Sequence, residues 1–311
     1  MEHTALLALA DRFGHPVLDG TLPASAATFS DGARFRIEIP SCEGPDVFAA
    51  VLDEAETRGV RIDRVSQGSG VMMLTDAEIR RMAAMGAGAG VEVNLFIGPR
   101  GAWDIGGQAK ATSAAGGAAR GNATLAACVN EALRAVDLGI RSLLVGDVGV
   151  LEVLGRMKED GVLPAELALK TSVLMPLANA PTGAVYERLG ATSLNVSTDL
   201  PVRDIAEIRA ATAAAVDVYV EVPDDQGGAV RFYDVAELIR TAAPVYVKLG
   251  VRNAPNIYPS GRHIAGLAAD LGRERVRRAE LALTLLADLA PGLAARPDAD
   301  SRPSDLRVPV V

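Results

Sequence analysis

The chain has 311 residues with a formal net charge of −8, and this acidic balance argues against a nucleic-acid or anionic-membrane surface. It carries two cysteines, Cys42 and Cys128, too few for a four-thiolate zinc or iron–sulfur site or for a disulfide framework. With no recognisable secretory signal and no apolar run as long as a membrane span, we expect a reduced, cytoplasmic protein.

Eight short β-branched runs recur along the chain, most of them one β-loop-α-loop unit apart. In chain order they are residues 34–40, 60–67, 91–97, 142–147, 167–172, 192–197, 216–222 and 244–250. Helix-like segments lie between them, and one carries a capping signal, Thr75 followed by Glu78. This alternation predicts a (β/α)₈ TIM barrel in a single domain. An open doubly wound sheet is the alternative, although no G-x-G-x-x-G motif follows the first strand.

The barrel should occupy residues 34–290, between an N-terminal segment (1–33) and a C-terminal tail (291–311) that we expect to be flexible and poorly ordered. After the third strand, the Gly/Ala-rich insertion 98–123 is either a lid that carries Trp103 over the catalytic face or a loop without a role in the chemistry. The sequence before the tail predicts a long amphipathic helix, which serves a homodimer or covers the barrel base.

The alternation of polar and apolar residues along the strands indicates which side chains point into the barrel. Because burial of polar groups is costly unless they pair or face a ligand, those near the strand C-termini predict a site at the barrel mouth. Arg36 and Glu92, early in their strands, could instead pair near the floor. The expected inward residues are Arg36, Glu38, Glu92, Asn94, Phe96, Lys170, Ser172, Ser193, Asn195, Ser197, Tyr219, Glu221, Tyr246 and Lys248.

Lys170 and Lys248, at one barrel mouth, allow two chemistries. A lysine desolvated beside another cation can lose its proton and attack a carbonyl, which forms a Schiff base. Alternatively, both lysines stay charged and hold a carboxylate or phosphate, while Glu38 or Glu221 acts as general base.

Further candidates would orient the substrate or hold its acidic group. Two are strand amides, and four follow the eighth strand beside an expected helix start, where free N–H groups suit an anion. They are Asn94, Asn195, Arg252, Asn253, Ser260 and Arg262.

No cofactor is expected from the sequence. A divalent metal is possible, because Glu38, Asp147 and Glu221 could bind Mg²⁺ or Mn²⁺ through oxygen.

Three segments in the middle of the chain, SLLVGDVGVLEVL (142–154), residues 167–210 and VDVYVEVPDD (216–225), carry a family resemblance. Together they resemble the collagenase-like peptidase family U32, which implies a TIM-like barrel. Family members that hydroxylate ubiquinone precursors or RNA hold an iron–sulfur cluster through four cysteines. This chain has PDDQGGAVRFYDV (223–235) in place of the cysteine-bearing segment. The resemblance therefore implies a divergent member without an iron–sulfur cluster.

These observations predict an enzyme that acts on a small polar or anionic metabolite by acid–base or Schiff-base chemistry of the lyase, aldolase or isomerase type. The rival enzymatic interpretation is a peptidase or amidohydrolase of the U32 type, which a bound metal or a reactive Cys42 would favour. A non-catalytic interaction module is the third, and it predicts internally paired polar residues and a mouth closed to ligands.

Overall fold

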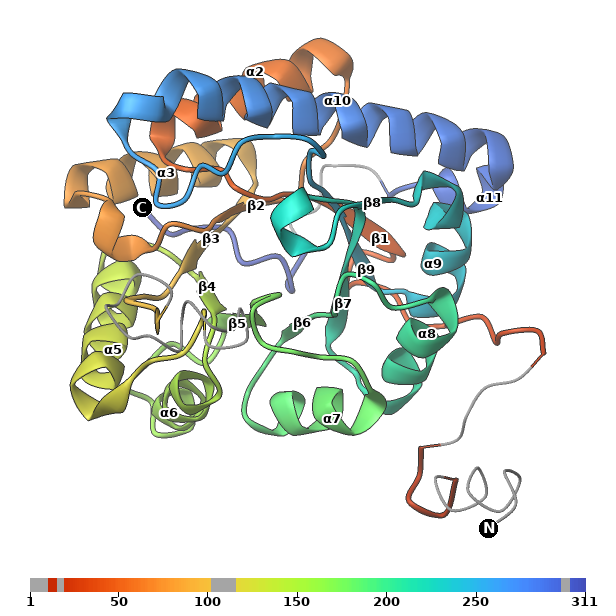
Figure 1. Ribbon diagram of the computed structural model, residues 1–311, viewed down its shortest axis with the longest axis horizontal. Helices are drawn as coiled ribbons and strands as arrows, with labels where there is room; N and C mark the ends of the chain where they lie inside the picture. The colour runs from red at the N-terminus through yellow and green to blue at the C-terminus, as the bar shows by residue number, and fades with distance from the viewer. Residues whose placement is uncertain (1–10, 16–19, 102–115, 298–302) are drawn as a thin grey trace.

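The computed structural model describes residues 11–15, 20–101, 116–297 and 303–311. Within these residues, eight parallel strands close into a barrel with helices around it (Figure 1). The order around the ring is β1-β2-β3-β4-β5-β6-β7-β9, and β9 pairs with β1 to complete it. The predicted (β/α)₈ TIM barrel is therefore confirmed.

Each predicted strand is present. Seven are shorter than predicted, β2 by four residues, whereas β7 begins one residue earlier. The residues are buried on both faces, because one side of a barrel strand packs against helices and the other fills the interior. A short strand that was not predicted, β8 (Ala229–Val230), pairs antiparallel with the end of β7. The barrel strands are β1 (Phe35–Ile39), β2 (Arg64–Gln67), β3 (Glu92–Phe96), β4 (Ser142–Val145), β5 (Ala168–Thr171), β6 (Ser193–Asn195), β7 (Ala215–Val222) and β9 (Val245–Leu249).

Three of the described helices, α3, α6 and α7, begin at side-chain caps that the sequence encodes. Thr75 and Glu78 form the expected capping box of α3, and Asp147 and Asn179 accept backbone N–H bonds at the starts of α6 and α7. Among the described helices, none combines the length and the apolar character that a membrane crossing needs. The outer layer consists of α2 (Pro45–Arg58), α3 (Asp76–Ala89), α5 (Gly121–Asp137), α6 (Val148–Glu159), α7 (Ala180–Arg188), α8 (Val202–Ala211), α9 (Val235–Ala242) and α10 (Ala265–Leu289), followed by the short α11 (Pro291–Ala294).

The long C-terminal helix is α10, close to its predicted bounds. It runs along α2 in the outer layer and also contacts β1 and β9 (Figure 1). It therefore covers a side of the barrel and not the base, which corrects one of its two expected roles.

The floor of the barrel, where the strands begin, is closed by two segments from opposite ends of the chain. From the N-terminal side, Phe29 packs edge-on against Tyr246, with ring centroids 5.1 Å apart, and the Arg36 guanidinium lies 4.0 Å from the centre of the Phe29 ring. From the C-terminal side come residues 303–311, whose Asp305 carboxylate accepts a hydrogen bond from Arg36 at 2.7 Å.

The expectation of a poorly ordered tail needs a correction for residues 303–311. Leu306 is buried, and the backbone N–H of Arg307 donates to the carboxylate of Glu92 at 3.1 Å. Charged groups buried at the floor need partners, and this segment supplies them. The proposed lid with Trp103 falls in 102–115, outside the described residues.

Gly155 offers a test of how closely the outer layer packs. It lies inside α6, and a Cβ atom there would stand 2.3 Å from the carbonyl oxygen of Leu189. Although alanine is the better helix former, we expect Gly155→Ala to lower the free energy of unfolding by roughly 1–3 kcal/mol, because the two backbones must separate. Urea unfolding measures this. Gly88→Ala in α3 is the control, since its Cβ meets nothing within 4 Å. Gly155→Ala at wild-type stability would contradict the close packing.

Candidate active site

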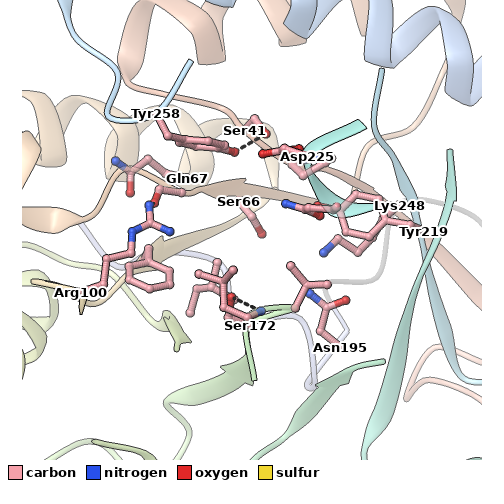
Figure 2. Close-up of a pocket in the computed structure, with 17 residues that line it drawn as sticks. Ser41, Ser66, Gln67, Arg100, Ser172, Asn195, Tyr219, Asp225, Lys248 and Tyr258 are labelled. Atoms are coloured by element: carbon pink, nitrogen blue, oxygen red, sulfur yellow. Dashed lines mark hydrogen bonds between the residues drawn. The ribbon is translucent and has the colours of Figure 1, made fainter. Parts of the chain in front are cut away.

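A pocket opens at the C-terminal mouth of the barrel, where enzymes of this fold carry their sites. Figure 2 shows Arg100 and Tyr258 at one side of it and Lys248 and Tyr219 at the other. Hydroxyl, amide and charged groups line the space between them, so the pocket suits a polar molecule. The polar lining residues are Ser41, Ser66, Gln67, Arg100, Ser172, Asn195, Tyr219, Asp225, Gln226, Lys248 and Tyr258.

Beneath the pocket lies a group of six buried ionisable side chains, which we call the Arg64 cluster. Each comes from a different strand, so closure of the barrel brings them together. Three are cations and three are acids, and none is more than 3% exposed. The members are Glu38, Arg64, Glu92, Lys170, Asp217 and Lys248.

Arg64 holds the three acids of the cluster together. Its Nε donates to Glu92 at 2.7 Å, and its Nη1 donates to Asp217 at 2.9 Å and to Glu38 at 3.3 Å. The Tyr246 ring stacks on the guanidinium, 3.5 Å from its centre. Burial disfavours the cation, but the attraction of Glu92 and its neighbours outweighs it and raises the pKa of Arg64.

Glu38 and Lys170 form a fully buried ion pair, and Lys170 Nζ also lies 3.6 Å from an Asp217 oxygen. Burial lowers the pKa of Lys170 to about 8, although Asp217 and Glu38 oppose the shift. Burial alone would raise the pKa of Glu38, but Lys170, Lys248 and Arg64 hold it well below its usual range. Burial also raises the pKa of Asp217, against the attraction of Lys170 and Arg64. At neutral pH Glu38 is therefore a carboxylate.

Lys248 connects the cluster to the pocket. Of the six cluster members, it alone lines the described part of the pocket wall. Its Nζ lies 3.7 Å from a Glu38 oxygen and 4.0 Å from the centre of the Tyr219 ring. In the amide orientation that satisfies both its oxygen and its nitrogen, the side-chain oxygen of Asn195 accepts from this Nζ at 2.9 Å. Burial lowers the pKa of Lys248, although Glu38 and Asp217 oppose the shift. A lysine so placed can present an amine to a bound molecule.

Several of these residues were not among the sequence-based candidates. Asp217 alternates with Tyr219 along β7, and Arg64 and Ser66 alternate around Val65 on β2, so the same inward pattern could have identified all three. Asp225 follows β7, and its carboxylate points into the pocket (Figure 2). The sequence indicates a role for Asp225 less clearly, because this residue lies in a loop beyond the strand, where the alternation of inward and outward side chains has ended.

The structure corrects the expectation for Glu221. A β-bulge interrupts the pairing of β7 with β9 between Tyr219 and Glu221, so Glu221 comes opposite Leu249 and turns away from the cluster. Its carboxylate lies 3.0 Å from Arg278 of α10 and accepts the backbone N–H of Arg252 at 2.9 Å. Glu221 is thus a partner of the helical layer.

Asn94 and Asn195, the two predicted amides, lie at different depths. Asn195 lines the pocket, whereas Asn94 lies below it and hydrogen-bonds to the hydroxyls of Ser142, at 2.7 Å, and Ser66, at 3.3 Å.

The candidates after β9 do not reach the pocket. On the exposed rim, the Asp224 carboxylate accepts a hydrogen bond from the Arg252 guanidinium at 2.7 Å. It also accepts one from the backbone N–H of Asn253. Ser260 and Arg262 line a separate hollow beside the start of α2. Arg252, which was expected to bind the substrate, is therefore paired with Asp224 instead.

Arg36 and Glu92 are both buried, as the sequence indicated, but they do not pair with each other. Arg36 bonds to Asp305, and Glu92 bonds to Arg64 and to the backbone of Arg307. The expected ion pair between them was wrong because the chain supplies nearer partners to each.

Glu38, Asp147 and Glu221 do not converge on a metal site. Asp147 caps α6 by accepting the Val150 N–H at 3.0 Å, and the two glutamates bind separate cations. Across the described ranges, no three His, Cys, Asp or Glu side chains are arranged to hold a metal ion.

Cys42 has the features of a packed core residue. It is fully buried, and burial, together with the nearby Glu43, raises the pKa of its thiol. Because the thiolate is the nucleophile, this environment does not support a reactive Cys42.

Residues 117–222 match the model of peptidase family U32. The resemblance to family U32 is thereby confirmed. The matched U32 range contains Lys170, Asn195 and Asp217, whereas Glu38, Arg64 and Lys248 lie outside it. No curated protein matches the chain.

Several solved structures match most of the length of the chain. The U32 peptidase Mk0906 is 15% identical, over 96% of this chain and 91% of that one, with a TM-score of 0.40. Thiamine phosphate pyrophosphorylase from Pyrococcus furiosus is 11% identical, over 80% and 98%, with a TM-score of 0.42. The ribulose-1,5-bisphosphate carboxylase/oxygenase from Pyrococcus horikoshii OT3 is 13% identical, over 84% and 63%, with a TM-score of 0.47.

The central position of Arg64 predicts a large stability effect. We expect Arg64→Met to lower the free energy of unfolding by roughly 3–5 kcal/mol, because three buried carboxylates lose their common cation. Urea unfolding checks the value. Arg252→Ala, which removes a rim ion pair with half-exposed partners, should leave stability nearly unchanged. Equal effects of the two variants would mean that Arg64 does not hold the cluster.

Proposed function

We propose that this chain is a Schiff-base enzyme of the lyase or aldolase type, acting on a small polar or anionic metabolite with a carbonyl group. The observation that carries the proposal is the position of Lys248, whose amine belongs to the buried cluster and also lines the pocket. A Schiff base requires an unprotonated amine within reach of substrate, and burial at Lys248 favours that form.

The proposed first step joins Lys248 to the substrate. Nζ attacks the carbonyl carbon and forms a C–N bond, and the carbonyl oxygen leaves as water with one proton from the amine and one from an acid. The resulting protonated Schiff base withdraws the electron pair of a neighbouring C–C or C–H bond, and water later releases the product and restores the amine. The Glu38 carboxylate, 3.7 Å from Nζ, would stabilise the cation.

Asp225 is our candidate for the acid and base of these steps. Its carboxylate points into the pocket from the exposed rim. Partial burial of the carboxylate and the nearby charge of Asp224 raise its pKa, which suits a group that exchanges protons nearer neutral pH. It takes the role that the sequence had suggested for Glu221.

The rest of the pocket supports a hydroxylated or acidic substrate. Ser66, Ser172 and Asn195 offer hydrogen bonds at its base. Arg100, 4.3 Å from the centre of the Phe96 ring, would attract an acidic group at the far side.

The alternatives have less support. Two charged lysines that bind an anion would both need access to it, and Lys170 is fully buried against Glu38. A U32-type peptidase with Cys42 as nucleophile is disfavoured by the buried thiol. An interaction module was expected to have a closed mouth, whereas this pocket is open and polar.

The proposal is tested by reductive trapping with cyanoborohydride and a panel of small oxo acids and sugar phosphates, read by intact mass. We expect one covalent adduct, which disappears in Lys248→Met because the attacking amine is gone. The matched control is Lys158→Met, since burial also lowers the pKa of Lys158 but this lysine donates to the Leu167 carbonyl away from the pocket. An adduct that survives Lys248→Met would rule out this lysine as the nucleophile.

The pH dependence gives a second prediction. Only the free amine reacts, so the trapping rate should rise as pH rises through the pKa of Lys248. Because burial lowers this pKa, the midpoint should lie below that of an ordinary lysine. Trapping rates are measured over a pH series for the protein and for a lysine peptide, and the midpoints of the two curves are compared. A midpoint equal to that of the peptide would show that the pocket does not activate Lys248.

A further inference from the structure

Residues 303–311, which we call the tail segment, occupy a fitted seat beneath the barrel. In Figure 1 this last part of the chain runs across the ring of strands to its end near α3. The Val310 N–H donates to the Gly139 carbonyl at 2.9 Å. Gly139 has a φ of +97°, and a Cβ there would stand 2.2 Å from the Val310 carbonyl oxygen. The seat therefore depends on a residue without a side chain.

The other end of the tail segment is anchored by charge. Asp305 accepts from Arg36 at 2.7 Å and from the Ser30 hydroxyl at 2.7 Å, and Arg36 itself is fully buried. Between the two anchors, Leu306 is buried in the floor. The tail segment is thus held at three points.

A continuous chain of contacts leads from this segment to the pocket. The Arg307 N–H donates to one oxygen of Glu92, at 3.1 Å, and the other oxygen accepts from Arg64 at 2.7 Å. Arg64 in turn donates to the carboxylate of Glu38 at 3.3 Å. The same carboxylate lies 3.7 Å from Lys248 Nζ. Each link is a charge-assisted contact between groups that are buried or nearly so.

We propose that the tail segment is a positioning element of the site, which fixes Glu92 through the Arg307 N–H, and through Arg64 and Glu38 fixes the environment of Lys248. It bears on catalysis only if the proposed function of Lys248 holds. With the tail segment released, water reaches Glu92 and Arg36, and the hydrated Glu92 carboxylate loosens its hold on Arg64. The charged form of Lys248 then becomes less costly, so its pKa moves up toward the ordinary lysine value.

The residues around Lys248 keep their identity when the tail segment is altered, so a change in the pKa of Lys248 would come from the tail segment. They come from five other strands and include the charged groups that act on its amine. They are Glu38 of β1, Arg64 of β2, Lys170 of β5, Asn195 of β6, and Asp217 and Tyr219 of β7.

The test removes one N–H group and nothing else that the cluster touches. Arg307 is the central residue of a three-residue turn closed by the Val308 N–H to the Leu306 carbonyl at 3.0 Å, a backbone geometry that proline adopts. Arg307→Pro therefore deletes the donor to Glu92, whereas Arg307→Ala keeps it and is the matched control. Acetylation of Lys248 by acetic anhydride in the full-length protein, followed by peptide mass analysis over a pH series, reports the free amine directly.

We expect the labelling profile of Arg307→Pro to move up by about one pH unit, which makes labelling at neutral pH about tenfold slower, while Arg307→Ala follows the wild type. If Arg307→Pro does not fold, Val310→Pro and its control Val310→Ala repeat the comparison at the other anchor, with a smaller shift in the same direction. A profile unchanged in the proline variants overturns the inference.

The two proposals can fail separately. Acetylation of Lys248 needs no substrate, so a shift in the proline variants supports the tail segment as a positioning element even if no oxo compound forms an adduct. Conversely, an adduct on Lys248 together with an unchanged acetylation profile would leave the proposed function standing and reject the role of the tail segment.

Discussion

Arg64 carries its guanidinium into the middle of the barrel, and most of the polar interior is arranged around it. In the strand register, Glu38 of β1 and Glu92 of β3 lie directly beside Arg64 on either side. Asp217 reaches it from β7 across the interior. A buried cation is tolerated only when its partners and hydrogen bonds are complete. The closure of the ring and the pairing of Arg64 therefore depend on each other.

This arrangement fixes the charge of some members of the cluster more firmly than that of others. With three cations and three acids, the six side chains balance when all are charged. Arg64 stays protonated, and Glu38 stays ionised because cations surround it. The two lysines are the cations whose pKa burial lowers, and of these Lys248 faces the pocket. Arg64 and Glu38 thus keep their charges in the interior, while the amine of Lys248 faces the pocket.

Much of the fold and part of the site could be predicted from the sequence. Strand spacing gave the barrel because each βα unit has a characteristic length, and alternation placed Lys170 and Lys248 inside because a strand has a period of two. The same rule failed at Glu221, since a bulge shifts that period by one residue and leaves no mark in the composition. It also could not rank the inward residues by depth, which separates Asn195 in the pocket from Asn94 beneath it.

Contacts between distant segments were beyond such reasoning. Nothing near Arg252 signals that Asp224 would bind it on the rim, and nothing in residues 303–311 announces a seat beneath the barrel. Considered alone, a short segment such as residues 303–311 is predicted to be disordered, because its partners belong to elements elsewhere in the chain. The tail segment is ordered because it forms hydrogen bonds with the buried Arg36 and Glu92.

The tail segment also sets an order of events during synthesis. Asp305 meets Ser30 across 275 positions of sequence, and every barrel strand leaves the ribosome before residues 303–311 do. The ring can therefore assemble first, with the floor still wet and Glu92 and Arg36 in contact with water. The tail segment then supplies the partners of Arg36 and Glu92. The polar contacts at the floor of the barrel can therefore be completed only after the eighth barrel strand has been synthesised.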